Sequence, residues 1–470
     1  MAYKDLREFL DLLRDKELLK TVKRQVDPTW EIGAIMREMF DRRGPAILFE
    51  KVKDTDYRFV SGVMDTFPRF ALGIGCEPGV RDIVGKVLAA CEHPLEPVVV
   101  SDGPCQENIL TGNDVDLDIF PIPRWHRLDG GRYITLGIAV TKDPETGKRN
   151  VAVNRQQVYA KNKVGVHAVQ QTGVLLNKYR QLGQAMPVAV AIGVSPAILA
   201  AACVRAVLGQ DEFGIAGALR GEPVELVKCR TIELEVPANA EVVLEGEIPP
   251  DDNLWEIEGP FGEATGYYSG DKSRKPTINL KALTFRHDAV MQGTLEGYPP
   301  SESTTLRTIG GTVGVWSKVQ KLGIPGIKEI YVTDMGCANF MVRVALERQF
   351  YAGHARQVME AIWASLSHNA KWVIVFDNDI DIYDRGQVEW ALSTRVQPHR
   401  DIIITSGRQP GMDLDPSIPP EDRVYPGVWS SRIGIDATSD FKGYDFPPVI
   451  KPSDQEQKKL KTNWPDYGID

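Results

Sequence analysis

The chain has 470 residues, which exceeds the length of one compact core and predicts two or three domains. Its hydrophobic content of 43% and charged content of 25% are typical of a globular protein, and its net charge of −9 argues against nucleic acid or an anionic membrane as the main partner. Six scattered cysteines without a CxxC pair fit reduced thiols and disfavour a zinc site built on cysteine.

The first part of the chain alternates between helix and strand signals. Residues 5–20 are expected to form a helix, because Phe9 and several leucines recur near helical spacing on one face. Residues 47–49 and 98–100 are short apolar runs that predict buried strands. This alternation indicates an α/β region over residues 1–113.

Strand signals dominate the middle of the chain, with proline and glycine between them. The expected strands are residues 134–141, 151–159, 188–192, 231–236, 241–245 and 278–286. One helix is expected in this part, after Pro196. A β-barrel or a sandwich is the natural arrangement of such strands.

The most apolar segment runs from Met186 to Val207. Its composition would suit a membrane span, but Pro187, Gly193 and Arg205 interrupt it, so it predicts a strand, a turn and a helix. No apolar stretch of signal-peptide type follows the charged N-terminus. We therefore expect a soluble, cytoplasmic protein without a transmembrane segment.

The last third of the chain returns to alternating signals. Residues 329–332 and 373–376 are expected to be strands, and residues 354–366 a helix. The tail after Pro447 is rich in proline, lysine, aspartate and glutamine. It is expected to be a surface segment or an arm that binds a partner.

Two glutamates stand out in the run EGPFGE. Glu258 and Glu263 lie five residues apart across a turn that can bring both carboxylates toward one point. Paired carboxylates in different environments can divide the roles of ionised base and proton donor. A surface turn with two solvated glutamates remains an open alternative.

Two further segments carry candidate polar groups. Arg155 belongs to a predicted strand, and a guanidinium there suits a carboxylate, although a surface salt bridge is an open alternative. Glu212 and Asn150 could supply oxygen ligands to a hard divalent cation, but Glu212 is also compatible with a simple helix start. No HExxH, GxSxG, P-loop or GxGxxG motif is present.

Taken together, these segments resemble the UbiD family of decarboxylases, which use prenylated FMN and include the 3-octaprenyl-4-hydroxybenzoate and ferulic acid enzymes. The likeness extends from Tyr3-Lys-Asp-Leu-Arg7 to Gly434-Ile-Asp-Ala-Thr438. It is made specific by the run EGPFGE joined to RNVxxxRQQ, which spans Arg149 to Gln157.

The resemblance implies roles for particular residues. Arg155 matches the arginine that holds the substrate carboxylate, Glu258 the acid that pairs with it, and Glu263 the acid that delivers a proton after carbon dioxide leaves. The implied cofactor-binding residues are Asn150, Val153, Asn154, Arg155, Gln156 and Gln171.

The resemblance also implies a divalent ion, usually manganese, held by Asn150 and Glu212 against the cofactor phosphate, with potassium nearby. The third ligand in the family is often a histidine, and the aligned position here is Gln171. His167 can substitute if the segment is helical, because residues four apart then share a face. Gln171 can also coordinate through its amide oxygen.

The fold implied is α+β. After the N-terminal region, a split β-barrel over residues 114–310 would bind the flavin, and an α/β domain over residues 311–470, with its terminal arm, would make the contacts of a homodimer or homohexamer. The active site is expected between domains.

The expected function is non-oxidative, reversible decarboxylation of an aromatic or α,β-unsaturated carboxylic acid, such as a phenolic acid or an aromatic acyl thioester. The cofactor would be prenylated FMN from a flavin prenyltransferase. The alternatives are an FMN-dependent oxidoreductase on a split barrel and a non-catalytic subunit of a decarboxylase complex. A metal-dependent hydrolase fits poorly because no histidine cluster is present.

Overall fold

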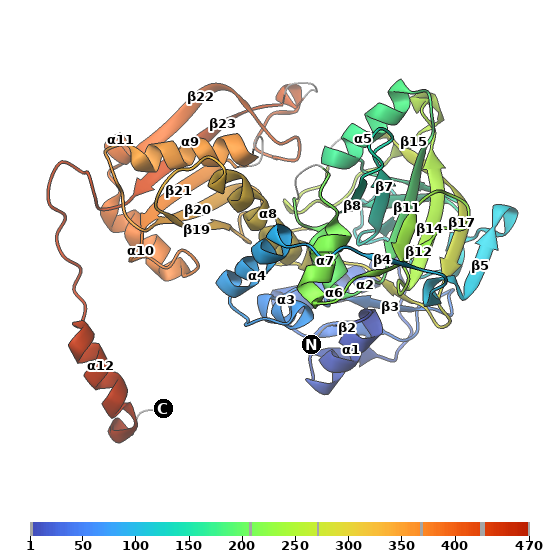
Figure 1. Cartoon of the computed structure of the whole chain (residues 1–470), viewed down its shortest axis with the longest axis horizontal. Coiled ribbons are helices and arrows are strands. Elements are labelled where there is room, and N and C mark those ends of the chain that lie inside the picture. Colours follow the sequence, from blue (N-terminus) through green and yellow to red (C-terminus); the bar gives the residue numbers. More distant parts are fainter. Residues whose placement is uncertain (1–2, 206–208, 270–271, 367–369, 424–427, 469–470) are drawn as a thin grey trace.

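The computed structural model describes residues 3–205, 209–269, 272–366, 370–423 and 428–468. Its architecture is α+β. A curled central sheet lies beside an N-terminal layer of helices and strands, and a separate C-terminal sheet carries its own helices (Figure 1). The helix α8 (Glu302–Gln320) runs between the central region and the C-terminal sheet.

The N-terminal region packs helices against a small sheet. The strand order is β1-β2-β3-β18, formed by Leu19–Val22, Ala46–Phe49, Arg58–Ser61 and Val290–Gln292. The helices are α1 (Leu6–Asp15), α2 (Glu31–Asp41), α3 (Phe67–Ile74) and α4 (Val80–Glu92). The predicted strand over 47–49 is confirmed as β2. Because β18 pairs with β3, a distant part of the chain completes this region.

The first helix is shorter than predicted. Asp5 caps its start by accepting a hydrogen bond from the Glu8 backbone N–H at 3.0 Å. The helix ends at Asp15, because Glu17 adopts the left-handed conformation with φ 57° and the chain then enters β1. The prediction is therefore wrong for residues 16–20.

A second small sheet has the order β13-β12-β4, formed by Glu235–Pro237, Glu225–Lys228 and Val98–Val100. The strand at 98–100 is confirmed but is not buried, since Val99 at the sheet edge is 55% exposed. Of the strand predicted over 231–236, only the last two residues pair. Thr231 turns away because its backbone N–H and hydroxyl donate to buried Glu245 at 2.7 and 2.8 Å.

The central sheet has the order β6-β9-β10-β17-β14-β11-β7-β8, with β5 beside β17, and curls into a half-barrel. In chain order, β5 to β11 span Asn108–Thr111, Tyr133–Ile134, Ile138–Lys142, Arg149–Val153, Gln156–Ala160, Lys163–Gly165 and Met186–Ile192. The later strands are β14 (Val242–Ile248) and β17 (Thr277–Phe285). The strands predicted over 188–192, 241–245 and 278–286 are confirmed, although their bounds differ by a few residues. A short hairpin, β15 (Glu256–Glu258) with β16 (Ser273–Lys275), stands beside this sheet.

Two predicted strands are interrupted. The run over 134–141 divides into β6 and β7, and the run over 151–159 divides into β8 and β9. The breaks pack against each other, because the Asn154 N–H donates to the Gly137 carbonyl at 3.1 Å. A Cβ at Gly137 would lie 2.2 Å from the Gln156 amide oxygen and 2.8 Å from Val190 Cγ1, so glycine allows this close approach. Arg155 consequently lies in the break between β8 and β9.

The central region contains more helix than predicted. The helix after Pro196 is confirmed as α6 (Pro196–Ala202), but α5 (Gln170–Gln181) and α7 (Glu212–Arg220) are also present. The sequence did not predict α5, because few apolar residues mark its inner face. The buried residues of this helix are Thr172, Leu175 and Leu176. Ala206 and Val207, at the end of the apolar segment, lie outside the described residues.

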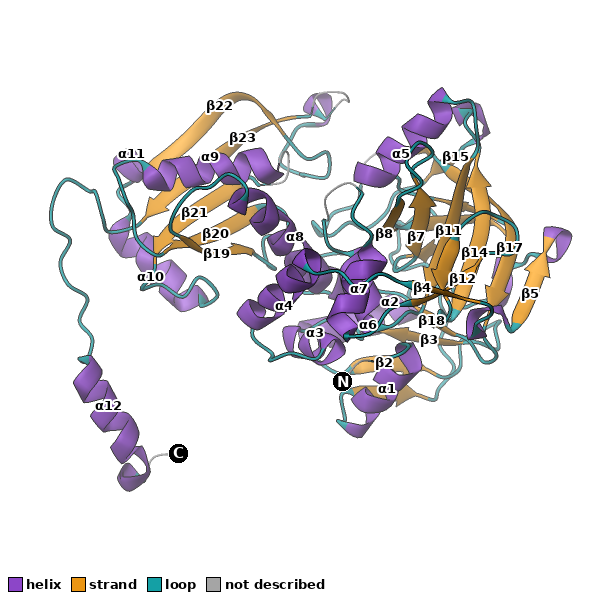
Figure 2. Cartoon of the chain, viewed as in Figure 1, coloured by secondary structure: helices purple, strands orange, loops and turns teal. Residues whose placement is uncertain are grey.

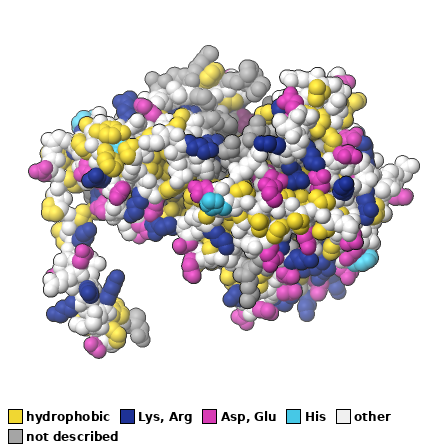
Figure 3. Space-filling model, in the orientation of Figure 1, with side chains coloured by type: hydrophobic (Ala, Val, Ile, Leu, Met, Phe, Trp, Pro, Cys, Tyr) yellow, Lys and Arg dark blue, Asp and Glu magenta, His cyan; other side chains and the backbone are white. Residues whose placement is uncertain are grey.

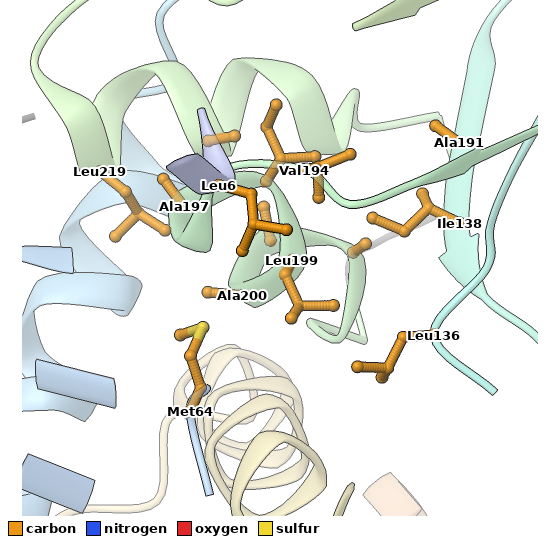
Figure 4. Packing of buried hydrophobic residues seen from close by; sticks show 14 of the residues in the cluster. Leu6, Met64, Leu136, Ile138, Ala191, Val194, Ala197, Leu199, Ala200 and Leu219 are labelled. Atoms are coloured by element: carbon orange, nitrogen blue, oxygen red, sulfur yellow. The ribbon is translucent and has the colours of Figure 1, made fainter. Parts of the chain in front are cut away.

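Helix α6 is at the centre of the largest core. Every side chain of α6 is buried. Figure 4 shows Ala197, Leu199 and Ala200 facing Leu219 of α7 and Met64 of the N-terminal layer. This packing fixes the position of the end of α6. In the described part of the chain, no helix has the length and apolarity needed to cross a membrane.

The C-terminal sheet has the order β19-β20-β21-β23-β22 (Figure 2). Its strands are Ile327–Val332, Met341–Leu346, Trp372–Asp377, Trp429–Ala437 and Ile402–Pro410, and its helices are α9 (His354–Leu366), α10 (Arg385–Arg395) and α11 (Pro398–Asp401). The strands predicted over 329–332 and 373–376 and the helix over 354–366 are confirmed.

The tail extends away from the rest of the molecule as an arm that ends in α12 (Asp454–Asn463) (Figure 1). Its exposure confirms the prediction of a surface segment. On the face in Figure 3, acidic and basic side chains are interspersed over the body, and several lysine or arginine side chains gather on the arm.

Candidate active site

A cavity of about 650 Å³ opens between the central sheet, α8 and the C-terminal region. The break between β8 and β9, the start of α5, the end of α6 and the start of α7 all contribute to its lining. Met412, Asp413 and Leu414 line it from the C-terminal region. The cavity is therefore assembled from segments far apart in the sequence.

Arg155 holds both predicted carboxylates. Its Nε and Nη2 donate to the two oxygens of Glu258 at 2.8 and 3.1 Å, and its Nη1 donates to Glu263 at 2.7 Å. The guanidinium also lies over the ring of Phe261, 4.9 Å from its centroid. The arginine side chain is 11% exposed and each carboxylate 6%. The alternatives of a solvated turn and a surface salt bridge are therefore wrong.

The turn between the two glutamates is held from behind by residues 129–133. The Tyr133 hydroxyl donates to the Gly259 carbonyl at 3.1 Å. The Asp129 carboxylate accepts the backbone N–H groups of Gly262 and His126 at 3.0 and 2.8 Å. Gly259 packs so closely on this segment that a Cβ would lie 2.4 Å from its backbone. These contacts fix the direction in which Glu263 leaves the turn.

The environment of Glu263 favours its protonated form. Burial raises its pKa to about 7, although Arg155 lowers it in part. The pKa of Arg155 lies above its ordinary value, because the attraction of the two carboxylates outweighs the effect of burial. The cavity thus combines a permanent cation with an acid that can hold a proton near neutral pH.

Two of the predicted metal ligands, Asn150 and Glu212, lie near each other at the start of α7. Glu212 is 3% exposed and accepts the Val151 N–H at 2.9 Å, which places it next to Asn150. Asn150 contacts the Thr172 hydroxyl at 3.3 Å. Asn150, Glu212 and Gln171 all line the cavity.

This donor set fits a hard divalent cation. A carboxylate and amides supply oxygen ligands, and burial raises the pKa of Glu212 to about 8, so a bound cation would stabilise its ionised form. Among the described residues, no cluster of three or more histidine, cysteine or acidic side chains suits a metal. A site here would therefore depend on amide ligands.

His167 lines the cavity but does not share a helical face with Gln171. Helix α5 begins at Gln170, so the condition under which His167 could replace Gln171 is not met. Of the other implied cofactor-binding residues, Val153 and Asn154 line the cavity. Gln156 instead lies fully buried in β9 and is absent from the described lining.

Family models match the chain along most of its length. They describe the N-terminal domain, the Rift-related domain and the C-terminal domain of 3-octaprenyl-4-hydroxybenzoate carboxy-lyase, UbiD, over residues 10–87, 97–299 and 304–437. The chain belongs to the UbiD family. As a UbiD-type protein it is a carboxy-lyase, that is, a decarboxylase.

Solved structures of UbiD relatives resemble the whole chain. The UbiD-class enzyme HmfF from Pelotomaculum thermopropionicum, in complex with FMN, is 34% identical with a TM-score of 0.86, covering 98% of this chain and all of that one. Vanillic acid decarboxylase of Sedimentibacter hydroxybenzoicus in its closed form is 30% identical, with a TM-score of 0.88 and full coverage of both chains. The 3,4-dihydroxybenzoic acid decarboxylase of Enterobacter cloacae is 27% identical, with a TM-score of 0.84 and full coverage of both.

The sequence did not reveal a second polar pair in the cavity of this UbiD protein. Arg307 in α8 donates to Glu296 at 2.9 Å, and both side chains line the cavity with Glu263. Arg205, at the end of α6, and Asn339, from the C-terminal region, line it as well. These residues belong to separate elements and share no motif, so no local signal could have grouped them.

Proposed function

We propose that the chain decarboxylates an aromatic or α,β-unsaturated carboxylic acid without oxidation, and reversibly, with prenylated FMN as cofactor. The observation that carries this proposal is Arg155 bound to two buried acids at the wall of the cavity. The UbiD relatives solved with FMN or prenylated FMN support a flavin in the same fold. When bound, the cofactor supplies the electron sink that protein side chains lack.

Arg155 is proposed to bind the carboxylate that will leave. Glu258 accepts two of its N–H groups, which holds the fork of the guanidinium in place. Glu263 takes one, so an entering carboxylate can compete with it for Arg155. Losing that contact removes the main factor that lowers the Glu263 pKa, and the acid then keeps its proton more firmly.

Glu263 is proposed to donate this proton to the carbon that loses carbon dioxide. Its burial excludes water from the proton path, and its fixed position replaces random encounter with a solvent acid. In the reverse direction the same carboxylate would accept the proton from that carbon.

Asn150, Glu212 and Gln171 are proposed to hold a divalent ion, most simply Mn²⁺, against the cofactor phosphate, with K⁺ nearby. Val153 and Asn154 would contact the cofactor from the break between β8 and β9. A flavin prenyltransferase would supply the cofactor. The region from residue 114 to 310 would then be the cofactor-binding domain, with the N-terminal region at 1–113 and an oligomerisation domain at 311–470.

The test is a decarboxylation screen over aromatic and acrylic acids, using protein produced with and without a flavin prenyltransferase. Carbon dioxide release only from the co-produced protein is expected, together with the absorption and mass of a prenylated flavin. Equal activity without the prenyltransferase would contradict the cofactor assignment. Turnover of NAD(P)H with plain FMN, and no release of carbon dioxide, would instead identify an oxidoreductase.

A further inference from the structure

The peptide group of Gly259, which directly follows Glu258, is held at both polar ends by side chains. Its N–H donates to the Gln157 amide oxygen at 2.9 Å, and its carbonyl oxygen accepts from the Tyr133 hydroxyl at 3.1 Å. The same hydroxyl lies 3.0 Å from the Gln157 amide oxygen, so its hydrogen is shared between two acceptors. The backbone next to Glu258 therefore has fixed partners on both sides.

These two side chains are placed by the pairing of β6 with β9, in which Tyr133 lies opposite Gln157. Tyr133 is fully buried and Gln157 is 5% exposed. Neither belongs to the described lining of the cavity. Their influence on the chemistry therefore passes through the residues that they hold.

Gln157 binds the same turn as Arg155. Arg155 directly precedes β9, and Gln157 is the second residue of that strand. The guanidinium binds the carboxylate of Glu258 with two N–H groups, while the Gln157 amide accepts the N–H of the next residue, Gly259. One short segment thus holds both the carboxylate of this acid and the backbone beside it.

Tyr133 also supports the guanidinium itself. Its ring packs on Phe261 with a centroid distance of 4.6 Å, and Arg155 lies over Phe261 at 4.9 Å. Burial and, to a smaller extent, the Glu258 carboxylate raise the pKa of Tyr133, so the hydroxyl keeps its hydrogen for these contacts.

Glu263 has a different support. The N–H of Gly262, the residue before it, donates to Asp129 at 3.0 Å. The two acids of one turn are thus held by separate side chains. A change at Gln157 should therefore displace Glu258 more than Glu263.

We propose that Gln157 and Tyr133 are positioning residues, which hold Glu258 so that it fixes the fork of Arg155 for the leaving carboxylate of the substrate. The inference rests on the function proposed above and adds two residues to it. An arginine that is ordered before the acid enters loses less conformational entropy on binding. These residues should therefore raise the affinity for the acid more than the rate of proton transfer.

Two variants remove the contacts and nearly preserve side-chain size. Gln157→Met removes the acceptor, and Tyr133→Phe removes the hydroxyl but keeps the ring. The first measurement is the crystal structure of each flavin-loaded variant. We expect the bidentate contact between Arg155 and Glu258 to be replaced by a single or longer contact. This result does not depend on which acid is the substrate.

The second measurement is steady-state kinetics with an acid that the decarboxylation screen identifies. KM should rise by roughly 3- to 10-fold, the value of one hydrogen bond, while kcat stays nearly constant. A rise in KM alone indicates the loss of binding that substrate and transition state share. A partly unfolded preparation would instead show a lower kcat and an unchanged KM, because only its folded fraction turns over.

The matched controls are Tyr331→Phe and Gln349→Met in the C-terminal region. Tyr331 and Gln349 are 5% and 6% exposed, and each makes side-chain hydrogen bonds of its own. These variants remove a comparable buried polar group far along the chain from the turn. They should leave both KM and the contact between Arg155 and Glu258 unchanged.

Double variants test whether the effect passes through Glu258. Tyr133→Phe added to Glu258→Gln should raise KM little further, because the residue that Tyr133 holds has already been changed. Tyr133→Phe added to Asp129→Ala should lower kcat/KM by the product of the two single effects, because Asp129 supports the other acid.

Three outcomes would overturn the inference: an unchanged bidentate contact in both variants, KM values no higher than those of the controls, or a full further rise in KM on top of Glu258→Gln. If the wild type decarboxylates no acid but the variants lose the bidentate contact, the positioning of Glu258 stands and the proposed reaction is refuted instead.

Discussion

At the scale of single residues, Glu258 and Glu263 show how one arginine can distinguish two acids. Both are equally buried and both contact Arg155. Glu258 makes a bidentate pair, and Glu263 a single contact with a pKa of about 7. The number of N–H groups that each acid receives therefore supports the proposed roles of charge partner for Glu258 and proton donor for Glu263.

Replacing the proposed donor tests this assignment. Glu263→Gln keeps the size and hydrogen bonding of the side chain but removes the transferable proton, so turnover should fall by about 10²–10⁴-fold. Flavin content should stay unchanged, and incorporation of solvent deuterium at the product carbon should fall in parallel. Glu258→Gln is the matched variant and should mainly raise KM. Normal turnover in Glu263→Gln with an inactive Glu258→Gln would mean that the roles are reversed.

The raised pKa of Glu263 predicts a pH dependence. A donor must be protonated, so decarboxylation should be fastest below the pKa of about 7 and should decline as the pH rises through it. The profile of kcat/KM against pH, which reports groups of the free protein, should show this loss on the alkaline side, and the profile of kcat at saturating acid should show it at higher pH. In Glu263→Gln the residual rate should no longer follow that profile. A decline confined to the acidic side would contradict the assignment.

Removing the proposed metal carboxylate should affect the cofactor. Glu212→Ala takes away the single acidic side chain proposed as a ligand, so divalent metal and flavin should be lost together. Metal analysis and the flavin-to-protein ratio measure this directly. Gln171→Ala should weaken both, whereas His167→Ala should have less effect because His167 precedes α5. Full flavin content in Glu212→Ala would exclude the site.

At the scale of elements, the turn between Glu258 and Glu263 depends on residues 129–133, to which no chemical role is proposed. Asp129 is 1% exposed and accepts two backbone N–H groups, one of them from the residue before Glu263. Neither β15 nor the break between β8 and β9 supplies an acceptor for the backbone N–H of Gly262. This N–H therefore depends on Asp129. The contacts of residues 129–133 therefore hold Glu263 in a fixed position relative to the rest of the fold.

The variant Asp129→Ala tests the role of these contacts. Two N–H groups lose their acceptor, so the free energy of unfolding should fall by about 2–4 kcal/mol. The looser turn should also lower kcat/KM. Denaturant titration and steady-state kinetics measure the two effects. The control is Asp118→Ala, which removes an exposed pair with Arg132 and should cost at most about 1 kcal/mol. Equal losses of unfolding free energy and of kcat/KM in the two variants would contradict the proposed role of Asp129.

At the scale of the whole molecule, the C-terminal region supplies part of the cavity lining, while the arm after it projects away from the body of the molecule (Figure 1). Helix α12 buries none of its side chains. Ile450 is fully exposed, and Leu460 and Trp464 are 42% and 45% exposed. Apolar side chains on a projecting arm are typical of an interface between copies of a chain.

A variant that ends at Pro447 tests this interpretation. If the arm joins copies of the chain, the variant without it should form a smaller species in solution than the full chain, as measured by size-exclusion chromatography with light scattering. Substituting aspartate for both Ile450 and Trp464 should have the same effect at full chain length, because charge disfavours an apolar interface. An unchanged mass in both variants would show that the arm does not hold the assembly together.

Local patterns determined much of the fold. The inner face of α1, the helix α9 and the strands β11 and β17 follow from apolar spacing within one short segment, and the structure confirms them. Elements without such a pattern escaped prediction: α5 has few apolar residues, and the break that frees Arg155 depends on contact with Gly137. The spacing of apolar side chains indicates which face of an element is buried. It does not indicate where the backbone of a distant segment will interrupt that element.

The same division holds for the site. The sequence singled out Glu258, Glu263 and Arg155 through short motifs and their resemblance to the UbiD family, but the residues alone left a solvated turn and a surface salt bridge open. Only the tertiary structure decided that one guanidinium binds both acids, that burial raises the pKa of Glu263, and that a second arginine, Arg307, shares the cavity. The physical reason is that hydrogen bonding, desolvation and charge act through space, and folding brings together groups that the sequence keeps more than a hundred residues apart.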